Sequence, residues 1–314
     1  MSDKRTFDTP RRVDSQLAHD ASRLATFDQY RGLLFSIAYR MLSSVADAED
    51  MLQESFIRWQ QAVDDEIRSP RAFLVTILTR LCINQLQSAR VQREEYVGEW
   101  LPEPLVTDPK SDPLGLLKID ESLSMAFRLL LERLTPLERA VFLLREVFEY
   151  DYAEIAKILA QTEANSRQIL RRAKRHVGEM RRRFDASAQA QSDLLKSFLQ
   201  AIRKGELEKL VELLASDVAL HSDGGGKAIA LPSLVEGAES VARSIFDSMG
   251  TLVPKNLVTR LTQINGEPGF VSYLNGKPFS AFTLHGSNGQ IQAIYVVTNP
   301  QKLSRLPNLP AAPS

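Results

Sequence analysis

A change in the spacing of apolar residues near residue 185 constrains the fold of this chain more than any other feature. Before this point, apolar residues recur every three or four positions, which is the spacing of amphipathic helices. After it, a helical stretch at 192–215 gives way to short β-like runs and to Asn-Gly steps at 265–266, 275–276 and 288–289. Both residues of an Asn-Gly step tolerate positive φ, so each step predicts a tight β-hairpin. The sequence therefore predicts a multidomain chain in which all-α units precede an α+β unit with a curled antiparallel sheet.

The first all-α unit is predicted at 24–95, after a flexible N-terminus at 1–23. Its second helix has Ser44 in the N-cap position, and its third helix begins at Pro70, a residue that suits the first turn of a helix. Four prolines follow within residues 96–118, together with several acidic residues. This composition predicts an extended linker.

A second all-α unit is predicted at 119–185. Its helices at 150–159 and 165–177 are joined by a five-residue turn, which is the spacing of a helix-turn-helix. Residues 166–183 contain eight lysine or arginine residues and one glutamate. A basic helix of this kind, in a chain whose net charge is zero, predicts contact with DNA phosphates.

Composition excludes several classes of protein. Cys82 is the only cysteine, so no internal disulfide can form. The four histidines are scattered, so no metal-ligand spacing is present and no cofactor is indicated. No apolar run approaches the roughly 20 residues that cross a bilayer, and the polar start lacks the apolar core of a signal peptide. The chain is expected to be cytoplasmic, with no metal, no cofactor and no membrane contact.

Acidic residues share one face of the predicted helix at 45–56. A solvated helix face explains such a spacing equally well. The Gln53–Glu54 pair and the following "SFIRW", however, resemble region 2.2 of bacterial sigma factors, an acidic helix that packs on the basic coiled coil of the large polymerase subunit. The resemblance implies a contact with bacterial core RNA polymerase through Asp47, Asp50, Gln53 and Glu54.

The next loop and helix resemble sigma regions 2.3 and 2.4, which open the −10 promoter element and flip a base out of the stack. Scattered arginines also occur on purely solvated helices, so it is their position after the acidic helix that carries this resemblance. A flipped base needs side-chain amides at its edge and arginines at its phosphates. The implied contacts with promoter DNA are Arg68, Ser69, Arg71, Arg80, Asn84 and Arg90, with Asn84 in "RLCINQL" facing the flipped base.

The stretch "LTPLERAVFLLREVFEYDYAEIAKIL" closely resembles sigma region 4, which reads the −35 element. Residues 24–185 together resemble a sigma factor of the extracytoplasmic-function (ECF) type, which keeps only regions 2 and 4. The start of the second helix of a helix-turn-helix reaches base edges in the major groove. The implied base contacts are Ser166, Arg167 and Arg171, and the implied phosphate contacts are Arg172, Lys174 and Arg175.

Three short motifs resemble the marks of ECF sigma factors that carry a fused SnoaL-like domain: "WLPEP" at 100–104, "DGGGK" at 223–227 and "NPQKL" at 299–303. The third departs from the usual "NPDKL" because Gln301 replaces the acid. SnoaL-like domains are cone-shaped α+β barrels that are similar to NTF2 and ketosteroid isomerase. The resemblance implies such a barrel at 192–300, followed by a tail at 301–314, in a transcription initiation factor with a built-in regulator.

The implied regulatory interface joins the SnoaL-like domain to the sigma core within one molecule. Because the domain is tethered, even a weak contact gains from a high effective concentration. At this level the sign of its effect on transcription, inhibition or activation, stays open, as does a small ligand of the barrel. The interface residues are Trp100, Leu101, Pro102, Glu103, Pro104, Asp223, Gly224, Gly225, Gly226, Lys227, Asn299 and Pro300.

The glycine run in "HSDGGGKA" is not interpreted as a nucleotide loop. A Walker-type loop needs a glycine where His221 stands and a hydroxyl residue where Ala228 stands. Glycines after a strand instead let another segment approach the backbone closely. The run is therefore interpreted as a docking loop, with Asp223 and Lys227 supplying charge at its ends.

Two other functions are weighed. In the first, the chain is a one-component DNA-binding regulator whose barrel senses a small ligand without polymerase binding, and the acidic face at 47–54 argues against it. In the second, the barrel is catalytic, which requires a positioned base and an oxyanion donor in an apolar pocket. The candidate residues form no recognisable motif, so no enzyme is expected; they are His221, Asp223, Tyr273, His285 and Tyr295.

Overall fold

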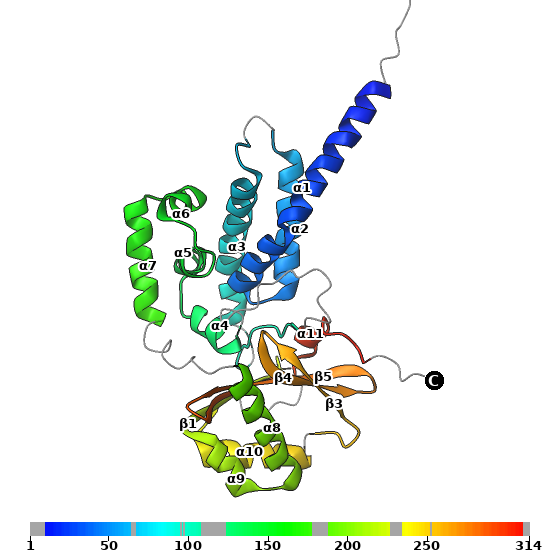
Figure 1. Ribbon diagram of the computed structural model, residues 1–314, viewed down its shortest axis with the longest axis vertical. Coiled ribbons are helices and arrows are strands. Elements are labelled where there is room, and N and C mark those ends of the chain that lie inside the picture. The colour runs from blue at the N-terminus through cyan, green and yellow to red at the C-terminus, as the bar shows by residue number, and fades with distance from the viewer. Residues whose placement is uncertain are drawn as a thin grey trace, which may run out of the picture.

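The computed structural model describes residues 10–63, 67–94, 96, 98–107, 124–177, 188–226, 234–251 and 253–309. Within these segments, a group of helices stands on one face of a curved sheet, and further helices cover the opposite face (Figure 1). None of the helices in the described segments combines the length and the hydrophobicity needed to cross a bilayer.

The first helical unit consists of α1 (Pro10–Leu42), α2 (Val45–Gln61) and α3 (Pro70–Glu94). As predicted, Ser44 caps α2, and its Oγ accepts the Asp47 N–H at 3.1 Å. The prediction of a flexible N-terminus at 1–23 is wrong from residue 10 onward, because α1 already begins there. Arg23 is buried, and its guanidinium donates to the carbonyls of Trp59 and Ala62 at the end of α2. A cation at a helix C-terminus is favourable, so this contact fixes α1 at Arg23 against the end of α2.

The second helical unit consists of α4 (Met125–Leu131), α5 (Pro136–Glu146), α6 (Tyr152–Leu159) and α7 (Glu163–Val177). Both α5 and α6 start with a capping box, in which the N-cap side chain and the third helical residue satisfy each other's backbone N–H groups. Ala160 ends α6 in the left-handed conformation (φ 52°) and turns the chain into α7. Helices α6 and α7 therefore form the predicted helix-turn-helix.

One apolar core joins the two helical units. Helix α5 lies against α1 and α3, and α6 also lies against α3. Leu74 and Leu78 of α3 belong to the same buried cluster as Phe142 of α5 and Ile155 of α6. The sequence predicted two separate units and carried no signal for this packing.

The C-terminal unit begins with α8 (Ala188–Lys204) and α9 (Leu207–Leu213), and α10 (Ala238–Thr251) interrupts its strands. The strands are β1 (Leu214–Asp223), β2 (Leu234–Glu236), β3 (Val258–Ile264), β4 (Glu267–Leu274), β5 (Lys277–Ser287) and β6 (Gln290–Val297). The sheet order is β2-β1-β6-β5-β4-β3. The short helix α11 (Pro300–Leu303) follows β6. Helices packed on a curled sheet give this unit the expected α+β architecture.

The hairpins of the sheet follow the Asn-Gly prediction. Asn265, Asn275 and Asn288 have φ between 52° and 56°, and the φ of the glycine after each of them is also positive. The expectation of a purely antiparallel sheet is wrong at one pairing, because β1 runs parallel to β6. The chain between β1 and β6 passes through α10 and three hairpin strands, so β6 returns beside β1 in the same direction.

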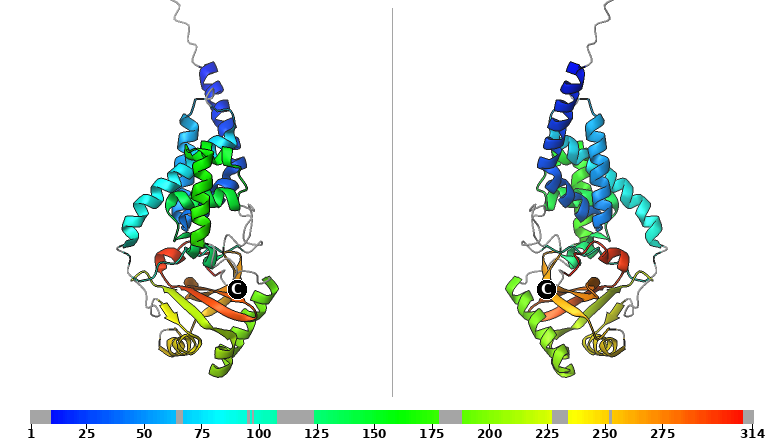
Figure 2. Two further views of the ribbon diagram at one scale, coloured as in Figure 1. Left: turned by 90° about the vertical axis from the view of Figure 1, so that its left-hand side faces the viewer. Right: turned by 90° about the vertical axis from the view of Figure 1, so that its right-hand side faces the viewer.

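The two faces of the sheet bury different partners (Figure 2). On one face, Leu220, Phe282 and Ile294 join a cluster with Phe198 of α8 and Ile245 of α10. On the other, the apolar cluster combines sheet residues with the linker, α4 and the segment around α11: its members include Leu101, Met125, Val271, Tyr295, Val297, Leu303 and Leu306. The second face therefore packs on the helical half of the molecule.

Candidate functional site

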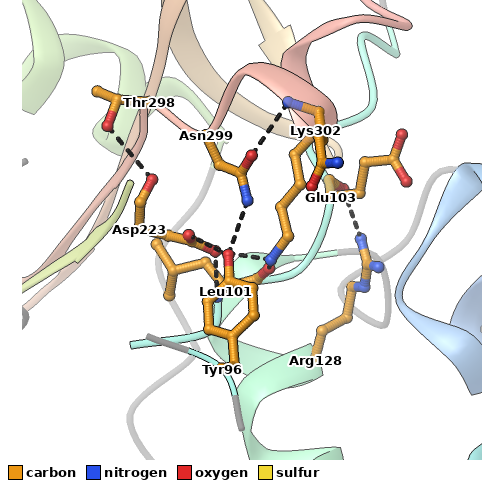
Figure 3. A network of polar contacts seen from close by, with 9 residues as sticks. Tyr96, Leu101, Glu103, Arg128, Asp223, Thr298, Asn299 and Lys302 are labelled. Carbon is orange, nitrogen blue, oxygen red and sulfur yellow. Dashed lines mark hydrogen bonds and ion pairs between the residues drawn. The ribbon is translucent and has the colours of Figure 1, made fainter. Parts of the chain in front are cut away.

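The carboxylate of Asp223, at the end of β1, lies where three distant segments meet. Asp223 is fully buried, with 0% of its surface exposed. Its oxygens accept hydrogen bonds from the Tyr96 hydroxyl at 2.6 Å and the Leu101 N–H at 2.8 Å, and form an ion pair with Lys302 Nζ at 2.6 Å (Figure 3). A buried carboxylate needs such donors, because an unpaired charge in the interior is strongly unfavourable. The "WLPEP", "DGGGK" and "NPQKL" motifs therefore meet around one carboxylate, which we call the Asp223 hub.

The backbone of Asp223 fastens the third motif as well. Its carbonyl accepts the N–H groups of Thr298 at 2.8 Å and Asn299 at 3.0 Å. The Asn299 side chain donates from Nδ2 to the Tyr96 hydroxyl at 2.7 Å and caps α11 by accepting the Gln301 N–H at 3.0 Å. Burial and the hydrogen bond to Asp223 raise the pKa of Tyr96, so this hydroxyl stays protonated and able to donate.

Gly225 explains why the "DGGGK" loop contains glycine. Its φ is +62°, and a Cβ built there would lie 2.3 Å from Asn299 Nδ2 and 3.1 Å from the Tyr96 hydroxyl. Both the backbone conformation and the close approach therefore require glycine. Gly224 is buried beside the hub, and Lys227 lies outside the described residues.

Lys302 binds the linker from the "NPQKL" side. Besides its ion pair with Asp223, its ammonium donates to the Leu101 carbonyl and lies over the Trp100 ring, 4.1 Å from the centroid. The side chain of Gln301, the residue that departs from "NPDKL", is exposed. Lys302 was missed as a site residue, although its place in the motif could have indicated it.

The other end of "WLPEP" binds the first helical unit. Glu103 is buried, and its Oε2 accepts the N–H of Val45, the first residue of α2, at 2.7 Å. Its own N–H donates to the Ser43 carbonyl at 2.9 Å. A carboxylate at a helix N-terminus is favourable. Burial nevertheless raises the pKa of Glu103 above its usual range, and the backbone donors only partly offset this effect. Residues 101–104 are all buried, so this part of the linker is a bridge of fixed structure.

Tyr39 of α1 also binds this part of the linker, at Glu103. Its hydroxyl donates to the Glu103 carbonyl at 2.9 Å, accepts from Asn265 Nδ2 at 3.0 Å and also accepts from Arg128. The Arg128 guanidinium is buried and lies 4.0 Å from the centroid of the Tyr39 ring. No local pattern marks Tyr39 or Arg128, whereas Asn265 was predicted only as a hairpin residue. Asn265 also exchanges hydrogen bonds of 2.8 Å with the backbone of Leu105.

The implied polymerase-binding residues lie on the outer face of α2. Asp50 and Gln53 are exposed, and Glu54 forms an i,i+4 ion pair with Arg58 at 2.8 Å. Asp47 lies nearer the core and accepts from Gln85 of α3 at 3.1 Å. Asp50, Gln53 and Glu54 are thus accessible in this arrangement of the chain, whereas Glu49 pairs with Arg305 of the C-terminal segment.

The implied −10 residues divide into two groups. Arg68, Ser69 and Asn84 are exposed, and Arg71 is exposed with its guanidinium 5.2 Å from the Tyr150 ring centroid. Arg80 instead turns toward the helix-turn-helix, where its Nε donates to the Ile158 carbonyl of α6 at 3.0 Å. The backbone of Arg90 lies in α3, and its side chain lies outside the described residues.

The implied −35 residues follow the amphipathic pattern of α7. The five basic residues are exposed, whereas Ile169, Leu170 and Ala173 are buried; the basic residues are Arg167, Arg171, Arg172, Lys174 and Arg175. Ser166 differs from the expectation, because it is fully buried and its Oγ donates to the Thr162 carbonyl at 3.1 Å. It faces the inside of the helix-turn-helix, one position away from the exposed stripe.

The two histidines among the candidate catalytic residues of the barrel pair with glutamates. His221 pairs through Nδ1 with Glu99 of the linker at 2.6 Å and stacks on Tyr295. His285 pairs with Glu267 at 3.3 Å, and Glu267 accepts the Met125 N–H at the start of α4. Within the described segments, no group of three or more histidine, cysteine, aspartate or glutamate side chains could hold a metal ion.

Comparison with known proteins agrees with this division of the chain. The family model of Sigma-70 region 2 matches residues 26–91, and that of Sigma-70, region 4 matches residues 124–177. The ECF RNA polymerase sigma factor SigJ of Mycobacterium tuberculosis is 34% identical over 296 residues, which cover 90% of this chain and 94% of that protein. The probable ECF RNA polymerase sigma factor SigI of the same species is 28% identical over 284 residues, covering 90% and 95%.

A solved structure extends the likeness to three dimensions. The crystal structure of M. tuberculosis SigJ matches with a TM-score of 0.74 and 32% sequence identity, and the match covers 90% of this chain and 98% of that chain. The coverage includes the C-terminal sheet unit together with both helical units.

Proposed function

Since the chain belongs to the ECF family of RNA polymerase sigma factors, we propose that it binds core RNA polymerase in the cytoplasm, recognises −10 and −35 promoter elements, and is inhibited by its own SnoaL-like domain. The observation that carries the inhibitory part is the contact between Arg80 of α3 and the end of α6, with Nε 3.0 Å from the Ile158 carbonyl. This contact joins α3, which carries implied −10 contacts, to the helix-turn-helix, which carries the implied −35 contacts.

The distance between the two promoter elements argues that this arrangement is closed. Elements at −10 and −35 lie about 25 base pairs apart, which is roughly 85 Å of straight duplex at 3.4 Å per base pair. Helices α3 and α6 are in direct contact, so regions 2 and 4 cannot each reach their own element. Initiation therefore requires the two regions to separate.

Arg80 is also occupied by the closed arrangement. Its guanidinium lies at the C-terminal end of α6, where the helix dipole favours a cation. A DNA phosphate would have to compete with these carbonyls for the same side chain. The closed arrangement thus occupies Arg80, one implied DNA contact, and holds the −10 and −35 contacts too close together for their two elements.

The SnoaL-like domain would hold the closed arrangement through "WLPEP". Leu101 is bound to the barrel at the Asp223 hub, and Glu103 is bound to α2 two residues later. Tyr39, Arg128 and Asn265 join region 2, α4 and the barrel at the same place. Residues 101–103 are thus fixed between the barrel and α2, and the tether keeps these contacts intramolecular. Asp50, Gln53 and Glu54 of α2 remain accessible, so core polymerase can make these contacts before the regions separate.

The proposal can be tested by measuring the distance between regions 2 and 4 in the full-length chain. Spin labels at Gln60→Cys and Gln168→Cys would report it, since both positions are exposed and the native Cys82 is fully buried. We expect a short distance in the free chain and a longer one after core polymerase and promoter DNA are added. Asp223→Asn should lengthen it without polymerase, and Asp247→Asn, an exposed change on α10, should not.

Run-off transcription with core polymerase supplies the functional readout. Asp223→Asn and Trp100→Ala should yield more transcript than the unmodified chain, and Asp247→Asn should match it. Equal transcription by all of them would refute the regulatory role of the hub. If the full chain and the hub variants all fail to bind core polymerase, the one-component regulator becomes the better description.

A further inference from the structure

A cavity of about 330 Å³ lies between the sheet and helices α8 and α10, on the face turned away from the helical half. Aromatic and aliphatic side chains dominate its lining, among them Phe198, Ile245, Phe270, Phe279 and Phe282. Its size and lining are those of sites for small organic molecules. Among the described residues that line it, Arg203 is the only charged one, and its side chain is exposed to solvent.

A buried hydroxyl in the cavity lining supplies the polar contact. Ser222 of β1 is 3% exposed, and its Oγ has no hydrogen-bond partner among the described residues. Leaving such a hydroxyl unsatisfied costs about 1–3 kcal/mol. The Oγ atom is enclosed in the cavity wall, so a ligand oxygen reaches it when the Ser222 side chain rotates toward the cavity. That hydrogen bond would remove this cost, whereas a purely apolar ligand would not.

We propose that the cavity binds an uncharged, ring-containing small molecule with one hydroxyl or carbonyl group, and that occupancy strengthens the Asp223 hub on the other face of the sheet. The phenylalanine rings select a ring-containing ligand because aromatic faces pack favourably. A lining without carboxylates and with one arginine at an exposed position favours a neutral molecule. Ser222 fixes the orientation by hydrogen bonding to the single polar group.

The ends of β1 and β6 connect the two faces of the sheet. Ser222 lines the cavity and Asp223 is the next residue, and consecutive strand residues point to opposite faces. Thr298 also lines the cavity, and its N–H donates to the Asp223 carbonyl at 2.8 Å. A ligand that holds Ser222 and Thr298 in these positions binds the hub-forming conformation best, and therefore increases its population. The consequence for transcription rests on the proposed function, whereas binding to the cavity does not.

Binding can be tested with 2-naphthol and naphthalene, which differ only in one hydroxyl group, on the full-length chain. We expect 2-naphthol to bind about 2- to 12-fold more tightly than naphthalene, the effect of one net hydrogen bond. Ser222→Ala should abolish this difference while both probes still bind. Ser248→Trp, which fills the cavity from α10, should abolish binding of both, and Ser240→Trp, exposed on the same helix, should bind both like the unmodified chain.

Three results would overturn the site: no binding of either probe, equal binding to the Ser248→Trp variant, or a preference for 2-naphthol that survives Ser222→Ala. Thermal unfolding of each variant shows whether the chain is still folded. Coupling is measured separately, as slower hydrogen exchange of the Leu101 N–H when 2-naphthol is bound. Unchanged exchange with intact binding refutes the coupling alone. The spin-label distances test the closed state independently, so failure of that proposal remains distinguishable.

Discussion

Replacing Asp223 by asparagine should release the linker from the barrel while preserving the shape of the side chain. Asparagine keeps one oxygen, which can still accept the Leu101 N–H. It removes the charge that faces Lys302 Nζ at 2.6 Å, in a pair whose side chains are 0% and 12% exposed. The lysine ammonium would then be largely buried without this carboxylate, and its other contacts include a carbonyl and two aromatic rings.

The free energy that the hub loses through Asp223→Asn should lie between two known limits. Losing one charge-assisted hydrogen bond costs about 1.5–3 kcal/mol, and breaking a buried ion pair by removing one partner costs about 3–5 kcal/mol. Because asparagine retains part of the polar network, we expect about 2–4 kcal/mol. If the hub opens locally, this loss raises the population of the open form about 30- to 900-fold.

Hydrogen exchange of the Leu101 N–H measures that opening directly, because this group donates to the Asp223 carboxylate. Its exchange should accelerate by the same 30- to 900-fold, with Asp247→Asn as the matched control. The double variant Asp223→Asn, Lys302→Met should lose less than the sum of the single changes, since it leaves no buried unpaired charge. Exchange at Leu101 that stays within a factor of about two, together with additive single changes, would refute the reasoning.

Three further predictions concern the loop, the closed arrangement and pH. Gly225→Ala should lower the free energy of urea unfolding more than Gly276→Ala. Both glycines have positive φ, but only at Gly225 would the new Cβ meet another residue, Asn299 at 2.3 Å. Equal losses of unfolding free energy, about 1–3 kcal/mol each, would mean that backbone strain alone matters. Arg80→Ala should lengthen the spin-label distance and raise the open population about tenfold, because losing its hydrogen bonds to α6 costs roughly 1.4 kcal/mol. An unchanged distance distribution would contradict this prediction. Because burial raises the pKa of Glu103 in the folded chain, the folded state binds its proton more tightly, and the free energy of unfolding should fall as pH rises above about 4.5. Glu103→Gln should flatten that slope in pH-dependent unfolding, and an identical slope would show that another group causes it.

Local features of the fold could be predicted because their causes are local. The cap at Ser44 and the start of α3 at Pro70 depend on one helical turn each, and the three Asn-Gly hairpins depend on two residues that accept positive φ. The glycines of "DGGGK" were expected to permit a close approach, and Gly225 does so. Ser166 was misplaced because one residue along a helix rotates the side chain by about 100°, from the DNA-facing stripe to the core.

The amino-acid order was enough to predict most of the helices, the hairpins and the short motifs, since periodicity, caps and turns act over a few residues. Three features depend on how the units pack in space: Tyr96, Leu101 and Lys302 converge on one buried carboxylate, Arg80 contacts the end of α6, and β6 runs parallel to β1. Such contacts join positions tens to hundreds of residues apart, and their free energy depends on burial that exists only after the units pack. The sequence does not show whether a charged side chain faces DNA or a neighbouring helix. Only the packing of the units distinguishes these two positions.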